Sequence, residues 1–232
     1  MELIFHFIMS INKVQILKNL PTFENHSKML VKEQSTGDII KAIIKAHENY
    51  SGQYDKICSF FYNPDEVIMA ENVFDFIKKN VRYEIEPDNL QQIKSPSAIF
   101  NTPASDCKNY ALAINGILDA AKRKYNFDYD LYYRFASYDG TNTPQHVFAV
   151  MVIDNEEIWI DPVLDYFNEY KEPNFYKDKK VKSMLVGLSG IDPYSNYADS
   201  SNRSIAAIPA PPKLTLSQGT GLNTATAPSS SP

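Results

Sequence analysis

Apolar residues recur every three or four positions in three stretches of the chain, which is the spacing of one helical face. The first predicted helix covers residues 38–50 and the second covers residues 65–81. The third begins at Cys107, with Asp106 in the position of an N-cap, and ends on the basic run Lys122–Lys124. Its apolar stripe consists of Tyr110, Ala111, Ile114, Leu118 and Ala121.

After the third helix the pattern changes from helical to alternating. Three runs rich in Tyr, Phe, Val and Ile predict β-strands at residues 131–138, 146–153 and 156–161. A loop at 140–144 separates the first two runs, whereas Asp154-Asn155 predicts a two-residue hairpin turn between the second and third. Helices followed by antiparallel strands predict an α+β fold.

The two ends of the chain differ from this middle part. Residues 187–232 are rich in Ser, Pro, Ala, Asn and Thr, and they contain too few large apolar side chains to offset the entropy of ordering. We therefore predict a low-complexity tail that is disordered or docks on a partner. The apolar opening, residues 1–9, has no basic segment and no small-residue cleavage site, which disfavours a signal peptide. We expect residues 1–60 to form a partly helical N-terminal extension.

Charge and cysteine content exclude several classes of protein. The net charge is −5, which disfavours a nucleic-acid partner, and the interrupted basic run at 177–182 is typical of a solvated helix end or loop. No stretch approaches the roughly 18 to 20 apolar residues that a bilayer span requires, so we expect no membrane partner. Cys58 and Cys107 are the two cysteines, too few for a disulfide framework, which favours a reducing, cytoplasmic setting.

Cys107, His146 and Asp161 are the candidate catalytic residues. A thiol becomes reactive as the thiolate, which a helix N-terminus and a nearby imidazolium both favour, and Cys107 has the first of these. His146 opens a predicted strand on the face that carries Phe148 and Val150. The other three histidines lie in the N-terminal quarter of the chain, in helix or loop contexts.

The predicted hairpin brings Asp161 toward His146. If Asp154-Asn155 is a two-residue turn, Ile153 pairs with Glu156, and His146 lies opposite Val163. Asp161 is then one pleat away from the position facing His146, on the same face and diagonal to it, so a side-chain hydrogen bond is permitted.

These three residues predict a nucleophile, a base and an orienting carboxylate acting on an amide carbonyl. The backbone N–H of Cys107 is a natural donor to the oxyanion, and Gln145 or Trp159 is the candidate for a second donor or a wall of the site. Cys58, between apolar neighbours, is expected to be an ordinary core residue. Thiol chemistry requires no cofactor. We expect no metal site, because the chain has no CxxC pair and no acidic cluster like a calcium loop.

Three motifs, in this order, resemble the transglutaminase-like superfamily of papain-like cysteine enzymes: Ala104-Ser-Asp-Cys-Lys-Asn-Tyr-Ala-Leu-Ala113, Pro144-Gln-His-Val-Phe-Ala-Val150 and Trp159-Ile-Asp-Pro162. The resemblance covers about residues 65–172 and implies a catalytic helix packed on an antiparallel sheet, with Cys107, His146 and Asp161 as the triad. It identifies residues 61–186 as the catalytic domain. The family usually has glycine directly before the Asp-Cys pair, where this chain has Ser105.

Two functions from different classes follow. The first is an active peptidase, amidase or transglutaminase-like enzyme with a protein or peptide substrate, hydrolysis being favoured over cross-linking. The second is a non-catalytic structural or assembly protein that retains the fold and binds a partner through the tail. The helical N-terminal part and the low-complexity tail are similar to proteins encoded among the virion genes of phages, which implies the host cytoplasm or a virion as the location.

Overall fold

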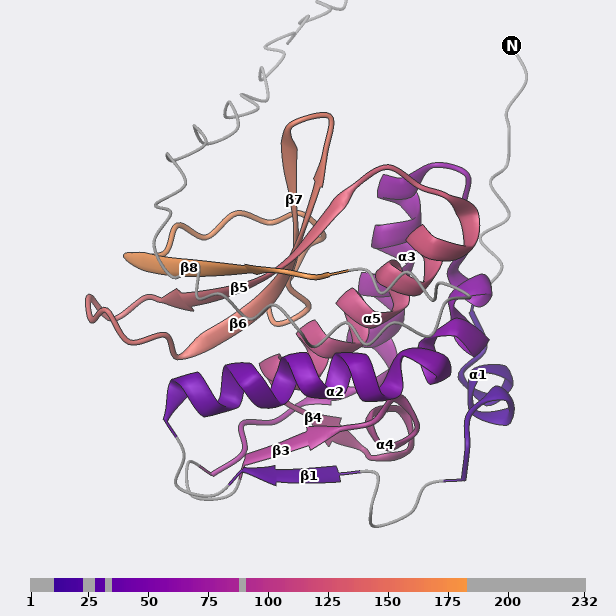
Figure 1. Cartoon of the computed structure of the whole chain (residues 1–232), viewed down its shortest axis with the longest axis horizontal. Helices are drawn as coiled ribbons and strands as arrows, with labels where there is room; N and C mark the ends of the chain where they lie inside the picture. The colour runs from indigo at the N-terminus through magenta and orange to yellow at the C-terminus, as the bar shows by residue number, and fades with distance from the viewer. Residues whose placement is uncertain (1–10, 23–27, 32–34, 88–90, 183–232) are drawn as a thin grey trace, which may run out of the picture. The chain divides into compact units, whose positions relative to one another are not determined.

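The computed structural model describes residues 11–22, 28–31, 35–87 and 91–182, with only the backbone of residues 28–31 (Figure 1). Its helices are α1 (Lys13–Asn19), α2 (Thr36–Ile57), the 3-10 helix η2 (Cys58–Phe61), α3 (Glu66–Asn80), α4 (Pro96–Asn101) and α5 (Cys107–Tyr125). Its strands are β1 (Lys28–Val31), β2 (Arg82–Tyr83), β3 (Gln91–Lys94), β4 (Ala104–Ser105), β5 (Asp130–Ser137), β6 (His146–Ile153), β7 (Glu156–Ile160) and β8 (Phe175–Lys180). The predicted tail and the apolar opening residues lie outside the described residues.

Side-chain caps set the starts of α2 and α3. Ser35 and Asp38 form a capping box at α2, in which each side chain accepts a hydrogen bond from the other residue's backbone N–H. Asp65 accepts from two backbone N–H groups at the start of α3. The helix α2 runs past the predicted end at residue 50, because Tyr54 and Ile57 continue its buried face.

The main sheet is antiparallel with strand order β7-β6-β5-β8. The predicted hairpin is confirmed: Ile153 pairs with Glu156, and Asp154 and Asn155 have φ of 51° and 66°, as a tight primed turn requires. The edge strand β8 corrects the prediction of a loop or helix end at residues 177–182. Its side chains are mostly exposed and charged, which suits a solvated sheet edge but removes the apolar alternation that would mark a strand in the sequence.

A buried arginine ties β8 to the rest of the sheet. Arg134 on β5 is 2% exposed and makes paired hydrogen bonds of 2.7–2.8 Å with Asp178 on β8 and with Glu157 on β7. Its guanidinium also lies over the rings of Trp159 and Tyr176. Burial opposes the positive charge, but the two carboxylates raise the pKa of Arg134 above its ordinary value, so the guanidinium stays charged.

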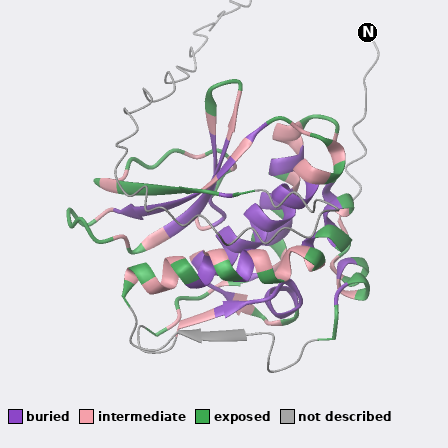
Figure 2. Cartoon of the chain, viewed as in Figure 1, coloured by how far each residue is buried: buried purple, intermediate pink, exposed green. Residues whose placement is uncertain are grey.

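The helix α5 lies at the centre of the fold, as Figure 2 shows by its burial. Every residue from Lys108 to Ala121 is buried, because the sheet covers one side of the helix and α2 and α3 cover others. A Cβ added at Gly116 would collide with the ring of Tyr54, so glycine permits the close approach of α2 to α5. The predicted α+β class, with the cysteine-bearing helix packed on an antiparallel sheet, is confirmed.

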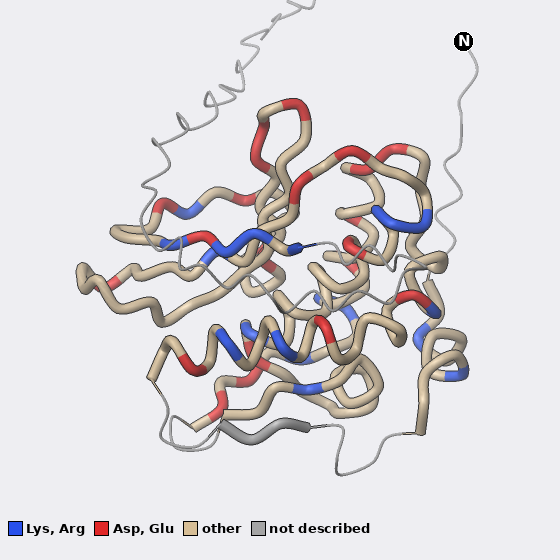
Figure 3. The backbone as a smooth tube through the Cα atoms, in the orientation of Figure 1, with Lys and Arg blue, Asp and Glu red and all other residues tan. Residues whose placement is uncertain are grey.

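The larger apolar cluster of the described residues extends from Ile16 in α1 to Val181 after β8, and a smaller one consists of Ala136, Phe148, Val150 and Trp159. The predicted domain limits at residues 60, 61, 186 and 187 stay predictions. Lys and Arg, and Asp and Glu, are spread over both the helices and the sheet of the described chain (Figure 3). In the described ranges, no helix is long and apolar enough to cross a bilayer. The same residues contain no group of three or more His, Cys, Asp and Glu side chains placed to hold a metal ion.

Candidate functional site

Cys107 is the first residue of α5, and its side chain is partly exposed. The first N–H groups of a helix have no acceptor within the helix, and the helix dipole is positive at this end, so negative charge is stabilised there. The residue before the N-cap, Ser105, is buried in the short strand β4, and the extended backbone of a strand does not require glycine. Serine at this position is therefore compatible with the turn into the helix.

Asp106 occupies the predicted N-cap position, but its carboxylate is bonded to side chains. It accepts from Lys108 Nζ and from Asn109 Nδ2, the latter at 3.0 Å. Lys108 also donates to Glu86 at 2.8 Å, and Glu86 lies 3.2 Å from Lys94. Burial raises the pKa of Asp106, and the Lys108 charge opposes that rise. A buried ionic cluster thus supports the backbone behind the cysteine.

His146 and Asp161 are in direct contact. His146 Nε2 lies 2.7 Å from Asp161 Oδ2, and the two side chains are 15% and 5% exposed. The other carboxylate oxygen of Asp161 accepts from the backbone N–H of Val163 at 3.2 Å, which fixes the carboxylate. His146 also stacks on Phe148, its neighbour on the same strand face, with ring centroids 5.8 Å apart.

The surroundings of His146 favour its charged form. Burial lowers its pKa, but the hydrogen bond to Asp161, a side-chain hydrogen bond with Cys107 and the charges of both partners outweigh burial and raise the pKa to about 10. Because Asp161 occupies Nε2, the ring nitrogen left for the thiol of Cys107 is Nδ1. The fold therefore brings Cys107, His146 and Asp161 together in the order thiol, imidazole, carboxylate.

Gln145 and Trp159, the candidates for a second oxyanion donor or a wall, have other partners. The side-chain amide of Gln145 donates to Asp139 and Thr141 at 2.9 Å, and its backbone N–H donates to Ala136. Trp159 Nε1 donates to Glu157 at 2.8 Å. Either role stays a prediction, and either side chain would have to leave these partners to reach an oxyanion.

Tyr83 belongs to this site and has no role in the sequence-based prediction. It is half-buried, and burial raises the pKa of its hydroxyl. The charges of Cys107, Asp106 and Asp161 and a side-chain hydrogen bond with Cys107 raise that pKa further. The sequence contains only a weak signal for it, since Tyr83 lies within the resembling span of about residues 65–172 but outside the three motifs. A two-residue strand carries no period from which its pairing could be deduced.

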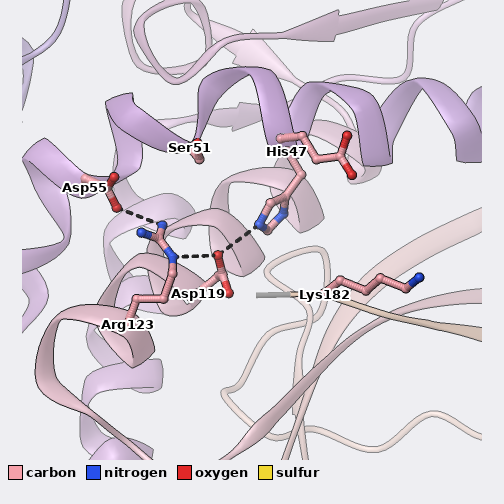
Figure 4. Close-up of a pocket in the computed structure, with 7 residues that line it drawn as sticks. His47, Ser51, Asp55, Asp119, Arg123 and Lys182 are labelled. Carbon is pink, nitrogen blue, oxygen red and sulfur yellow. Dashed lines mark hydrogen bonds and ion pairs between the residues drawn. The ribbon is translucent and has the colours of Figure 1, made fainter. Parts of the chain in front are cut away.

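A second histidine–aspartate pair lies further along α5 (Figure 4). His47 on α2 bonds the hydroxyl of Tyr133 at 2.7 Å and lies 3.5 Å from Asp119, which also contacts Arg123. The adjoining cavity of about 40 Å³ has room for water but not for a peptide or a cofactor. This pair is a structural link between α2 and α5. Cys58 is buried, as predicted for a core residue.

These features define an α+β protein whose long helix packs on a four-stranded antiparallel sheet and presents a cysteine beside a histidine–aspartate pair. No family model matches the chain, and no curated protein matches it. Among solved structures, the chain is similar to a putative protease from Parabacteroides distasonis, with 11% identity and a TM-score of 0.41. The match covers 62% of this chain and 30% of that one, so this chain spans less than a third of that protein.

Proposed function

We propose that this protein is a cysteine-dependent enzyme that cleaves or transfers amide bonds of a protein or peptide substrate. The observation that carries the proposal is the 2.7 Å contact between His146 Nε2 and Asp161 Oδ2, together with the interaction of the same imidazole with Cys107. It is the arrangement that a thiol nucleophile requires. The resemblance of three motifs to transglutaminase-like enzymes supports the same reading.

In the first half of the reaction, the Cys107 thiolate would attack the carbonyl carbon of the amide. A C–S bond forms, and the carbonyl oxygen becomes an oxyanion that the Cys107 N–H can bind. The oxyanion then collapses, the C–N bond breaks, and the imidazolium of His146 gives its proton to the leaving amine. The products of this half are a free amine and a thioester on Cys107.

In the second half, an acceptor attacks the thioester and His146 takes the proton of that acceptor. The C–S bond then breaks and the thiolate is restored. We favour water as the acceptor, because Cys107 and His146 are both partly exposed to solvent. A lysine amine in place of water would give transfer. The proposed binding of a virion or assembly partner by residues 187–232 concerns a segment outside the described residues.

Thiol labelling tests the proposal without knowledge of the substrate. The protein is treated with iodoacetamide at graded pH, and the label on each cysteine is quantified by mass spectrometry. We expect Cys107 to alkylate faster than a free thiol near neutral pH and to lose this advantage in the His146→Ala variant. Buried Cys58 is the internal control, since burial raises its pKa and shields it.

Two outcomes would contradict the proposal. One is alkylation of Cys107 no faster than that of a free thiol, with no change in His146→Ala. The other is a biological phenotype that survives Cys107→Ser but is abolished by deletion of residues 187–232, which would favour the structural or assembly function.

A further inference from the structure

Backbone pairing places Tyr83 beside the cysteine. The strands β2 and β4 pair in parallel, with Arg82 opposite Ala104 and Tyr83 opposite Ser105. Glu84 N–H donates to the Ser105 carbonyl at 2.9 Å, and Arg82 N–H donates to the Pro103 carbonyl at 3.2 Å. Because Ser105 precedes Cys107 by two residues, these bonds fix the backbone of Tyr83 against the start of α5.

Ring packing fixes the side chain as well. The Tyr83 ring meets the Tyr110 ring edge to face, with centroids 5.8 Å apart and an interplanar angle of 61°. Tyr110 lies one turn along α5 from Cys107, and its own hydroxyl donates to the Val81 carbonyl, two residues before Tyr83. The segment 81–83 is thus held to the first turn of α5 by backbone and side-chain contacts.

Three acidic groups act on the hydroxyl of Tyr83. Burial raises its pKa above the ordinary value, and the negative charges of Cys107, Asp106 and Asp161 raise it further. The phenol therefore keeps its proton at any pH at which the enzyme would work. A protonated phenol beside a thiolate is a hydrogen-bond donor.

We propose that the Tyr83 hydroxyl donates to the oxyanion, as the partner of the Cys107 backbone N–H. This inference rests on the proposed function, because an oxyanion forms only if Cys107 attacks a carbonyl. As the C–S bond forms, negative charge moves from sulfur to the carbonyl oxygen, which is two bonds from sulfur. The hydroxyl retains its proton and its hydrogen bond moves with the charge from sulfur to oxygen, so no proton is transferred.

A hydrogen-bond donor accelerates the reaction only if it binds the oxyanion of the transition state more strongly than it binds the resting thiolate. The contacts of the candidate donors favour Tyr83 over Gln145. Tyr83 interacts with the nucleophile itself, whereas the Gln145 amide is bonded to Asp139 and Thr141.

Two electrophiles that react with the same thiol test this role. Iodoacetamide alkylates a thiolate by displacement and forms no oxyanion, whereas 4-nitrophenyl acetate acylates it through a tetrahedral oxyanion. In Tyr83→Phe, which keeps the ring, we expect acylation of Cys107 to fall by about a hundredfold, as for the loss of an oxyanion donor. Alkylation loses only the hydrogen bond to the resting thiolate, so it should change by a much smaller factor than acylation. The readouts are release of 4-nitrophenolate and the mass of labelled protein.

The matched control is Tyr110→Phe, which also removes one hydroxyl from the Tyr83–Tyr110 pair but not the one that interacts with Cys107. The role of Tyr83 is overturned if Tyr83→Phe slows neither reaction, if it slows both equally, or if Tyr110→Phe slows acylation as much. If wild-type Cys107 reacts with neither electrophile faster than a free thiol, the proposed function fails together with this inference. The two failures are therefore distinguishable.

Discussion

His146 and Asp161 touch across the open end of a hairpin whose turn lies at Asp154 and Asn155. His146 is the first residue of β6, and Asp161 directly follows the last residue of β7. Their 2.7 Å contact is therefore set by the register of two adjacent strands.

Asp161→Asn is predicted to narrow the pH range in which Cys107 reacts. With Asp161 present, the raised pKa of His146 keeps the imidazolium charged up to about pH 10. Without the carboxylate, the His146 pKa falls toward the ordinary value of 6.5, because burial lowers it and the hydrogen bond and charge of Asp161 no longer raise it. The rate of Cys107 acylation by 4-nitrophenyl acetate, measured from pH 5 upward, should lose its imidazolium-dependent part at a lower pH than in the wild type.

Cys107 and Asp161 interact directly with the His146 ring and affect its titration. Tyr138 lies close to the same ring, with centroids 6.2 Å apart, and Tyr83 interacts electrostatically with Asp161. Asp165→Asn is the matched control, since the Asp165 side chain is 85% exposed and pairs only loosely with Lys78. A pH profile of Asp161→Asn that superimposes on that of Asp165→Asn would contradict the role of Asp161.

Arg134→Met is predicted to cost about 3 kcal/mol of unfolding free energy at neutral pH, because it leaves two carboxylates in a mostly buried site without their cation. The measurement is urea denaturation. Arg134 lowers the pKa of Glu157 against the opposing effect of burial, so its contribution is present above the ordinary value of 4.5 and is lost as pH falls through the lowered pKa. The difference between variant and wild type should therefore shrink in acid.

Arg82→Met provides the comparison for Arg134. Arg82 also contacts a carboxylate at 2.7 Å, that of Glu84, but the two side chains are 69% and 58% exposed. Its loss should change stability by no more than about 0.5 kcal/mol. If both variants lost the same unfolding free energy, burial would not be the reason that the Arg134 ion pairs stabilise the fold.

Substitution of two glycines by alanine is predicted to give opposite results. Gly116→Ala should destabilise the protein by about 1–3 kcal/mol, because the added methyl group meets the buried Tyr54 ring where α2 approaches α5. Gly52→Ala, in α2, should stabilise it by about 0.5–1 kcal/mol, because a Cβ there has open space and alanine favours a helix. Thermal unfolding of both variants followed by circular dichroism is the test. A stabilising Gly116→Ala would show that the helices can separate at no cost.

The parts of the site that depend on local chemistry could be predicted from the sequence. The turn at Asp154-Asn155 determines which residues face each other along β6 and β7, and simple counting then places Asp161 near His146. The start of α5 at Cys107 followed from the apolar stripe and the acidic residue before it.

Other parts depend on contacts that the chain makes over long separations. The pairing of Tyr83 with Ser105 involves two residues on each strand, too few for any periodicity. The strand β8 is an edge strand with charged side chains, which the sequence pattern does not mark as a strand. Arg134, which bonds Asp178 of β8, would be predicted from the sequence to be a surface residue. The bonds of Asp106 to Lys108 and Asn109 arise because Lys108 is buried, which composition does not reveal.

The burial of residues 108–121 means that most of the helix carrying the proposed nucleophile is enclosed by the rest of the fold. The hydrogen-bonded amides in the buried middle of α5 should therefore be the slowest to exchange with deuterium, and they should exchange only through global unfolding. Reactivity of Cys107 and protection of these amides should therefore disappear in a single cooperative transition. In that case there is no partly unfolded state in which the Cys107 thiol is fully exposed while the site around it is disrupted. The absence of such a state limits the reaction of Cys107 with unintended electrophiles.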